Sequence, residues 1–250
     1  MEGQTRRGRS ALAWALLFLL AQGLGWLTPF LSPEAVTAGV PVTLEEESGP
    51  KLVALTFDDG PKGKWTTKLL NGLDERGAKA TFFVIGAQVA EDPDKVRRMT
   101  SEGHEVGIHT YDHKSALTGL SKADFDAQVD RTRSLLASIL GERSFLVRPP
   151  YGAIDDSVRK WAGAPLILWS VDSEDWAKMN VEQEAAYLVE TVKDGDIILM
   201  HDIFPESVEA ALQVVDALHG QGFYFVTVSR LFEERGITLE NGESYSKAPG

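Results

Sequence analysis

Two adjacent carboxylates are the first groups in this chain whose type and spacing could do chemistry. Asp58 and Asp59 lie in the run LVALTFDDGP, where an apolar stretch is stopped by Gly and Pro. Side chains alternate along an extended chain, so the two carboxylates need not point the same way. One could bind a metal while its neighbour transfers a proton. The alternative interpretation is an Asx turn, because Asp is common where strands end.

Two histidines have a spacing that suits a divalent metal. His109 and His113, in HTYDH, place two imidazoles on one side of a helical turn or a tight loop. The pair proves little by itself: the chain holds five histidines, which produce such a pair by chance roughly one time in ten. The alternative is two hydrogen-bonded histidines. A carboxylate from another strand end would complete a His2Asp set with open positions, the layout of a catalytic metal site.

Four further side chains could complete an acid–base site around the opening pair, whose other Asp could serve as the base. His201, in ILMHD, is the natural proton donor for a leaving group, or else a core histidine. Arg148, in RPPYG, could hold a carboxylate by paired hydrogen bonds, or form a surface salt bridge. Asp175 could orient His201. Trp176 is either a groove wall or a core residue.

Composition limits the chemistry further. The chain has no cysteine, so any metal must be held by His, Asp or Glu. It also lacks a G-x-S-x-G sequence, which argues against a serine hydrolase. A formal net charge of −12 disfavours binding to nucleic acid or to an anionic membrane through bulk charge.

The elements that must position these groups alternate between apolar runs and helix-like stretches. Seven strands separated by helices predict a parallel sheet buried on both faces. An open doubly wound sheet and a closed barrel both fit this pattern. The expected strands are 51–57, 80–85, 104–109, 144–147, 165–170, 196–200 and 223–228. The expected helices are 64–76, 93–102, 122–140, 155–161, 181–192 and 207–218.

Ionisable residues gather where these strands end. Five of the seven expected strands are followed by Asp, His or Arg, and in parallel α/β folds the chemistry lies at the carboxyl ends of strands. Because random placement would scatter some of these residues to the other ends, the clustering favours a site over a set of turns. His104, at the start of a strand, is expected to be structural.

The N-terminus suggests export. Three arginines precede the uninterrupted apolar run Ala11–Leu20, which continues to Leu31 with Gln22 and Thr28 as its main polar interruptions. Residues 1–38 are therefore expected to be a signal peptide or an N-terminal membrane anchor, since 11–31 has about the length that spans a bilayer. Residues 39–50 are expected to be a linker and 51–232 a catalytic domain. Residues 233–250 are expected to be a tail that is irregular or loosely attached.

The order of the motifs resembles the polysaccharide deacetylases of carbohydrate esterase family 4, the NodB-homology domain. TFDDGP, HTYDH, RPPYG, DSEDW and LMHD occur in the family's order between residues 51 and 228. The resemblance implies a distorted (β/α)7 barrel. It also implies metal-dependent removal of N-acetyl groups from a polymer of the N-acetylglucosamine type.

The resemblance also implies which residue does which job around the metal. Carried over position by position, Asp59, His109 and His113 would bind a divalent metal, with zinc expected and cobalt or nickel as alternatives. Asp58 would be the catalytic base, held by Arg148. The spacing of these residues does not assign the two aspartates.

The remaining implied roles concern the leaving group and the acetyl group. His201 would be the catalytic acid, tuned by Asp175. The backbone N–H of Tyr151 would help to hold the oxyanion. Trp176 and Leu199 would line the acetyl pocket.

Two positions depart from the family's usual residues. Ile108 stands where the family often has Asn, and Asp112 where it often has Ser. An extra carboxylate beside His113 could strengthen that ligand or change the metal preference. Neither departure removes a ligand or catalytic residue, so an active enzyme is expected.

The functional expectation is an exported monomer that removes acetyl groups from an N-acetylated cell-wall glycan, with peptidoglycan as the first choice. A chitooligosaccharide deacetylase and an acetylxylan esterase are the alternatives among hydrolases. A catalytically silent protein that binds wall glycan is the alternative from a different class, because fold does not fix function.

Overall fold

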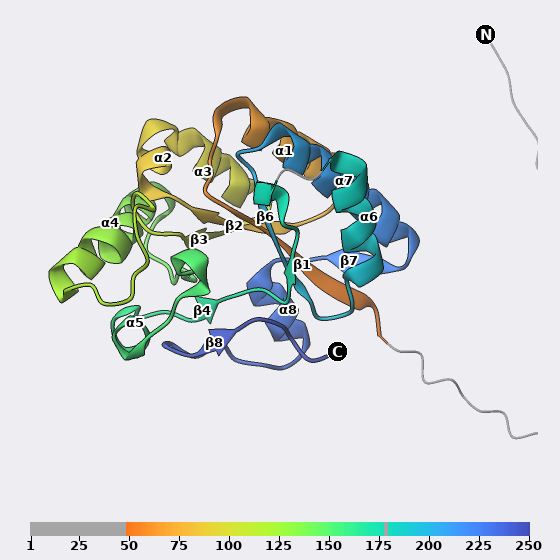
Figure 1. Ribbon diagram of the computed structural model, residues 1–250. Coiled ribbons are helices and arrows are strands. Elements are labelled where there is room, and N and C mark those ends of the chain that lie inside the picture. The colour runs from red at the N-terminus through yellow and green to blue at the C-terminus, as the bar shows by residue number, and fades with distance from the viewer. Residues whose placement is uncertain (1–48, 178–179) are drawn as a thin grey trace, which may run out of the picture. The chain divides into compact units, whose positions relative to one another are not determined.

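The central element of the protein is the long parallel strand β1, Lys51–Asp58 (Figure 1). The computed structural model describes residues 49–177 and 180–250. Strand β1 pairs in parallel with β2 (Ala80–Val84), β6 (Ile197–His201) and β7 (Phe223–Phe225). Asp58 lies in register with Phe83 on one side and with His201 on the other, so the first and sixth strands deliver ionisable residues to the same edge.

Parallel pairing continues around a curved sheet. Strand β3 (Glu105–Ile108) pairs with β2, and β5 (Val171–Asp172) pairs with β6. Beyond β3, single bridges lead through Val147 to β4 (Leu166–Ile167). Residues 168–170 then join β4 to β5, which returns the chain to the opposite edge of the sheet. The distorted barrel is thereby confirmed over the open sheet.

Alternate residues of β1 face two different apolar regions. Val53, Leu55 and Phe57 belong to the larger core formed with the surrounding helices, whereas Leu52 and Ala54 belong to a second cluster. That cluster also holds Val228, Leu231 and Phe232 of α8 (Val228–Glu234), which closes the amino-terminal end of the barrel. On the same face of β1, Thr56 and Asp58 follow, so a polar interior lies beyond the apolar one.

Helices surround the strands, and their ends follow the local sequence (Figure 1). The hydroxyl oxygen of Ser121 accepts a hydrogen bond from the N–H of Asp124, and Gly141 follows the last turn of that helix with a φ of 82°. These caps define the predicted helix 122–140. The helices before α8 are α1 (Gly63–Glu75), α2 (Gly86–Glu91), α3 (Pro93–Ser101), α4 (Lys122–Leu140), α5 (Asp156–Trp161), α6 (Val181–Thr191) and α7 (Pro205–Gly220).

Three expected strands differ from the structure. The stretch 144–147 contributes only the bridges of Val147, and within 165–170 only Leu166–Ile167 is a strand, because β5 begins at Val171. The last expected strand, 223–228, ends at Phe225 because the Thr227 hydroxyl caps α8. The short helix α2 was also not expected.

The C-terminal tail is firmly attached rather than loose. Strand β8 (Ser244–Tyr245) pairs in parallel with β4, and the ring of Tyr245 packs edge-on against Phe232. Ala248 is completely buried, and its N–H donates to the carbonyl of Gly195. The tail therefore belongs to the body of the barrel, because it covers the apolar cluster at the amino-terminal end.

The expected signal or anchor (1–38) and nearly all of the expected linker (39–50) lie outside the described residues. Within the residues that the structure describes, no helix has the length and apolar character needed to cross a membrane.

Candidate active site

One pocket of about 500 Å³ lies at the carboxyl ends of the strands and collects most of the expected site residues. They come from the ends of β1, β3 and β6 and from the short 3-10 turns Pro150–Gly152 and Asp175–Ala177. Parallel strands bring their carboxyl ends to one edge, which is why residues far apart in the chain meet here. The expected residues that line the pocket are Asp58, Asp59, His109, His113, Tyr151, Trp176, Leu199 and His201.

Asp59, His109 and His113 form a group that could hold a metal ion. Each offers one ligand atom, and these atoms all lie within 4.8 Å of one another. Asp59 Oδ1 is 3.7 Å from His109 Nε2 and 3.9 Å from His113 Nε2. The same Oδ1 is buried and accepts no hydrogen bond from any described residue. A buried carboxylate oxygen without a donor fits a cation ligand, so these residues suit the expected divalent metal.

The protonation of His109 also fits a metal ligand. Its Nδ1–H donates to the carbonyl of Arg148 at 2.7 Å, which leaves the Nε2 lone pair free. Burial lowers the pKa of His109, although the neighbouring Asp58 and Asp59 act to raise it. The imidazole is therefore held neutral, as metal ligation requires.

Asp58 is held by a fully buried arginine. Arg148 Nη1 donates to Asp58 Oδ1 and to the Thr56 hydroxyl, both at 2.8 Å. The guanidinium also donates to the carbonyls of Ile167 and Leu168, and it lies over the ring of Phe83. The second oxygen, Asp58 Oδ2, is 3.6 Å from His109 Nε2. One oxygen of Asp58 is therefore fixed, and the other is directed toward the metal-ligand group.

His201 is paired with a buried carboxylate. Its Nδ1 contacts Asp175 Oδ1 at 2.7 Å, and its backbone N–H donates to Asp175 Oδ2 at 2.7 Å. The Ser207 hydroxyl also donates to Oδ2. Burial alone would lower the pKa of His201, but the hydrogen bond and charge of Asp175, with Asp58 and Asp59, raise it to about 9. His201 is thus kept protonated at neutral pH, with Nε2 free to donate.

Aromatic side chains surround the mouth of the pocket. Tyr151 and Trp176 are both largely exposed, whereas Leu199 is buried in the wall. Tyr151 has a φ of 59° and its ring packs edge-on against His113. Because exposed aromatic rings present flat apolar faces beside hydrogen-bonding groups, this mouth suits a sugar-like ligand.

Two residues that line the pocket, Trp169 and Asp172, were not expected among the site residues. Asp172 follows an expected strand end, which was the available signal. Trp169 lay inside the expected strand 165–170 and not at its end, so its position gave no such signal. Asp112, the extra carboxylate beside His113, contacts Gln128 and Lys114.

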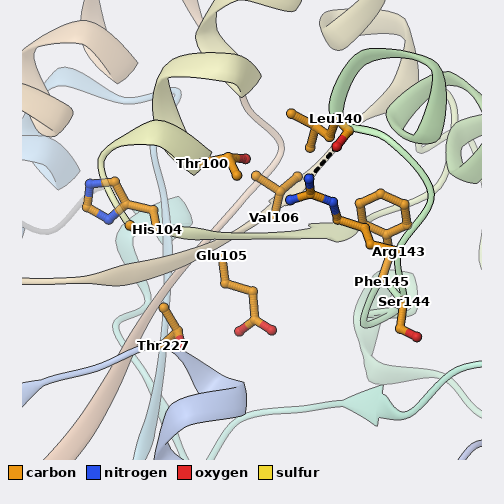
Figure 2. Close-up of a pocket in the computed structure, with 10 residues that line it drawn as sticks. Thr100, His104, Glu105, Val106, Leu140, Arg143, Ser144, Phe145 and Thr227 are labelled. Atoms are coloured by element: carbon orange, nitrogen blue, oxygen red, sulfur yellow. Dashed lines mark hydrogen bonds between the residues drawn. The ribbon is translucent and has the colours of Figure 1, made fainter.

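A second pocket, of about 310 Å³, lies at the opposite end of the strands, and its polar groups do not converge (Figure 2). The ring of His104 is turned away from Arg143 in Figure 2, and its Nδ1 accepts from the N–H of Ala80. Arg143 donates back to the carbonyl of Leu140. Glu105 accepts hydrogen bonds from Thr81 and Ser229. These hydrogen bonds join neighbouring residues, and His104 Nε2 is buried without a partner among the described residues. Because the polar groups do not converge, the carboxyl-end pocket is the candidate active site.

Comparisons with known proteins agree with this assignment. The family described as polysaccharide deacetylase matches residues 45–164. The peptidoglycan-N-acetylmuramic acid deacetylase PdaC of Bacillus subtilis is 38% identical over 80% of this chain. This chain spans only 43% of that relative's length.

A second relative is matched over almost its whole length. A peptidoglycan-N-acetylglucosamine deacetylase of Bacillus cereus is 37% identical over 76% of this chain and 92% of its own. Among solved structures, a family 4 acetyl xylan esterase from Clostridium thermocellum in complex with a cobalt ion has a TM-score of 0.75. That structure is 31% identical and is matched over 80% of this chain and 100% of its own. The chain therefore belongs to the polysaccharide deacetylase family, carbohydrate esterase family 4.

Proposed function

We propose that this chain is a divalent-metal-dependent deacetylase that hydrolyses N-acetyl groups of N-acetylglucosamine residues in peptidoglycan and releases acetate. One observation carries the proposal. A single pocket holds a three-residue metal-ligand group, a carboxylate with one free oxygen and an imidazole that Asp175 keeps protonated. The relatives named as peptidoglycan deacetylases support the choice of substrate.

In the proposed mechanism, Asp59, His109 and His113 would hold the metal, with zinc first and cobalt or nickel as alternatives. A divalent cation bound there would polarise the acetyl carbonyl and make water easier to deprotonate. Asp58 Oδ2 accepts a proton from the attacking water, while Arg148 keeps the carboxylate in place through Oδ1.

His201 completes the reaction on the leaving-group side. As the carbon–nitrogen bond breaks, His201 Nε2 donates its proton to the departing sugar nitrogen, and Asp175 stabilises the imidazole through Nδ1. The Tyr151 N–H is proposed to donate to the oxyanion, and Trp176 and Leu199 to contact the acetyl methyl group. The products are acetate and a free amine on the sugar.

Hydrolysis of an acetyl ester is the second candidate. The acetyl xylan esterase from Clostridium thermocellum shares this fold at 31% identity, and ester cleavage needs the same water activation and leaving-group protonation. The relatives also differ in the sugar that they are named for, N-acetylmuramic acid or N-acetylglucosamine. Substrate choice is therefore the point that the experiment must decide.

The test is acetate release by the full chain from peptidoglycan, chitopentaose and acetylated xylan. Each substrate is assayed after chelation and again after zinc, cobalt or nickel is added. Release from peptidoglycan that is lost on chelation and restored by metal is expected, and mass spectrometry of the digested glycan identifies the sugar that lost its acetyl group. Release from xylan alone would favour the esterase, and no release from a folded, metal-loaded protein would favour a silent glycan-binding protein.

We also propose that the protein is exported and acts at the cell wall. The basic residues before the apolar run 11–31 support this location. Fractionation of cells that express the full chain, with mass analysis of its N-terminus, would distinguish a cleaved signal from a retained anchor. Recovery in the cytosol with an intact N-terminus would contradict export.

A further inference from the structure

The turn that follows Asp59 is held by a residue without a role in the proposed mechanism. Asp59 has a φ of 73°, a backbone conformation that L-residues rarely adopt without support. After it, the carbonyl of Gly60 accepts a hydrogen bond from Ile85 N–H at 3.0 Å. Beneath the same turn lies Asp202, which is completely buried.

Asp202 is joined to this turn through a threonine hydroxyl. The N–H of Lys62 donates to Thr66 Oγ1 at 2.7 Å, and Thr66 Oγ1 in turn donates to Asp202 Oδ2. Thr66 is also completely buried and lies in the first turns of α1. This short chain of hydrogen bonds therefore ties residue 62 of the turn to the end of β6.

Direct packing fixes the other part of the turn. A Cβ atom on Gly60 would lie only 2.6 Å from Asp202 Cγ, closer than real Cβ contacts occur. The carboxylate of Asp202 thus occupies the space where any other residue at position 60 would place its side chain. Glycine at this position is explained by that contact and not by an unusual φ.

We propose that Thr66 and Asp202 are positioning residues for the metal site: they hold the Asp59–Lys62 turn so that Asp59 Oδ1 faces His109 and His113. The inference rests on the metal site of the proposed function. Neither Thr66 nor Asp202 lines the active-site pocket, so they act through Asp59. Residues that orient a metal ligand in this way commonly change metal affinity when they are lost.

The opposite end of the sheet supplies a matched control. There the N–H of Val228 donates to Thr81 Oγ1 at 2.9 Å, and Thr81 Oγ1 donates to Glu105 Oε2 at 2.9 Å. Thr81 is completely buried, like Thr66. Both threonines thus link a backbone N–H to a carboxylate, but only Thr66 does so beside a metal ligand.

The experiment compares Thr66→Val, Thr66→Ser and Thr81→Val in the full chain. Zinc affinity is measured by competition with a chromophoric chelator, and the thermal midpoint is measured on the metal-free protein. Because valine preserves the shape but not the hydroxyl, Thr66→Val is expected to weaken zinc binding about tenfold. Thr66→Ser is expected to restore wild-type affinity. Thr81→Val is expected to lower the thermal midpoint of the metal-free protein without changing zinc affinity.

Each outcome has a defined meaning. Equal zinc affinity in Thr66→Val and wild type overturns the inference, as does an equal loss in Thr81→Val, which would indicate a general effect of stability. If Thr66→Val does not fold, Thr66→Ala removes the same hydroxyl without added bulk and is judged by the same criterion. A wild-type chain that binds zinc but releases no acetate would contradict the proposed function and leave the affinity test intact. A wild-type chain that binds no divalent metal overturns both.

Discussion

The two ends of the barrel contain similar groups in different states. Each end has a pocket, a buried histidine, a threonine linked to a carboxylate, and an arginine. At the amino-terminal end, Glu105 accepts hydrogen bonds from Thr81 and Ser229, and Arg143 donates to the carbonyl of Leu140. Those hydrogen bonds join neighbouring backbone and side-chain groups, which is a structural role.

At the carboxyl end, each group is held on one side and open on the other. Arg148 fixes one oxygen of Asp58, and a backbone carbonyl fixes one nitrogen of His109. Asp175 fixes one nitrogen of His201. The remaining atoms face a common pocket. His104 is also fixed through Nδ1 and has no partner at Nε2 among the described residues, but no other reactive atom converges on it. Fixed groups whose reactive atoms converge on one pocket distinguish a site from a structural cluster.

The largest expected effect comes from removing the proposed base. Asp58→Asn keeps an acceptor for Arg148 but loses the proton-accepting carboxylate, so acetate release is expected to fall about a thousandfold. The matched change at the other end, Glu105→Gln, is expected to leave turnover within about twofold of wild type, since it lies outside the site. Steady-state acetate assays on both metal-loaded variants give the measurement. Comparable activity losses in the two variants would contradict the distinction between the ends.

A smaller, pH-dependent effect is expected from Asp175→Asn. Burial acts to lower the pKa of His201, but Asp175, with Asp58 and Asp59, raises it to about 9. A proton donor loses activity as pH rises through its pKa, so removing this carboxylate should move the alkaline limb of kcat to lower pH. The loss is expected to be about tenfold at pH 8 and much smaller at pH 6.

Bound metal is expected to shift the pH–rate profiles of both wild type and Asp175→Asn. A divalent cation on Asp59 counters part of the negative charge near His201, so the alkaline limb of the loaded enzyme is expected below pH 9. The direction of the shift in Asp175→Asn is unchanged by this. An alkaline limb at the same pH in the variant and in wild type would exclude His201 as an acid tuned by Asp175.

Exposed aromatic rings at the two ends give the next comparison. Trp176 is 60% exposed at the pocket mouth, and Tyr224 is 59% exposed on β7. Trp176→Ala is expected to raise KM for chitopentaose about fivefold with little change in kcat, because a stacked ring contributes about 1 kcal/mol of binding. Tyr224→Ala should change neither constant. A fall in kcat with constant KM for Trp176→Ala would indicate a role in the chemical step instead.

Much of the site could be predicted because strand ends are visible in sequence. Asp58, His109 and His201 each follow an apolar run, and parallel pairing brings such positions to one edge. The division of work between Asp58 and Asp59 came only from the family resemblance. In the structure Arg148 donates a hydrogen bond to Asp58, 90 positions away in sequence. Local pattern carries no information about such a pairing.

The elements that could not be predicted depend on long-range contacts. The stretch 165–170 is apolar enough for one strand, but only Leu166–Ile167 forms one, paired with β8, whereas the N–H of Ser170 donates to the carbonyl of Ile197 on β6. The pairing of β8 with β4 involves only two residues on each side, too few to leave a pattern in the tail. The contact of Thr66 with Asp202 likewise joins residues 136 positions apart. In each case tertiary contacts decided what local periodicity left open.

The smallest expected effect on activity, with a clear effect on stability, comes from His104 at the amino-terminal end. Burial, with the nearby Lys79 and Arg98, lowers the pKa of His104 to about 4. In the unfolded chain the pKa of His104 is about 6.5, so the folded state loses stability relative to the unfolded state as pH falls from about 6.5 toward 4, where the imidazole must stay neutral to remain buried. That difference corresponds to about 2 kcal/mol of unfolding free energy between pH 7 and pH 5.

His104→Asn retains an acceptor for the N–H of Ala80 but cannot titrate. Unfolding free energies are measured with urea and tryptophan fluorescence. Between pH 7 and pH 5, the value for the variant should fall by about 2 kcal/mol less than the value for wild type. Acetate release at pH 7 should remain within about twofold of wild type, because His104 faces no substrate group. Equal pH dependence in both proteins would show that His104 already titrates normally when folded. A large loss of activity in His104→Asn would instead show that His104, at the amino-terminal end, affects the active site at the carboxyl end.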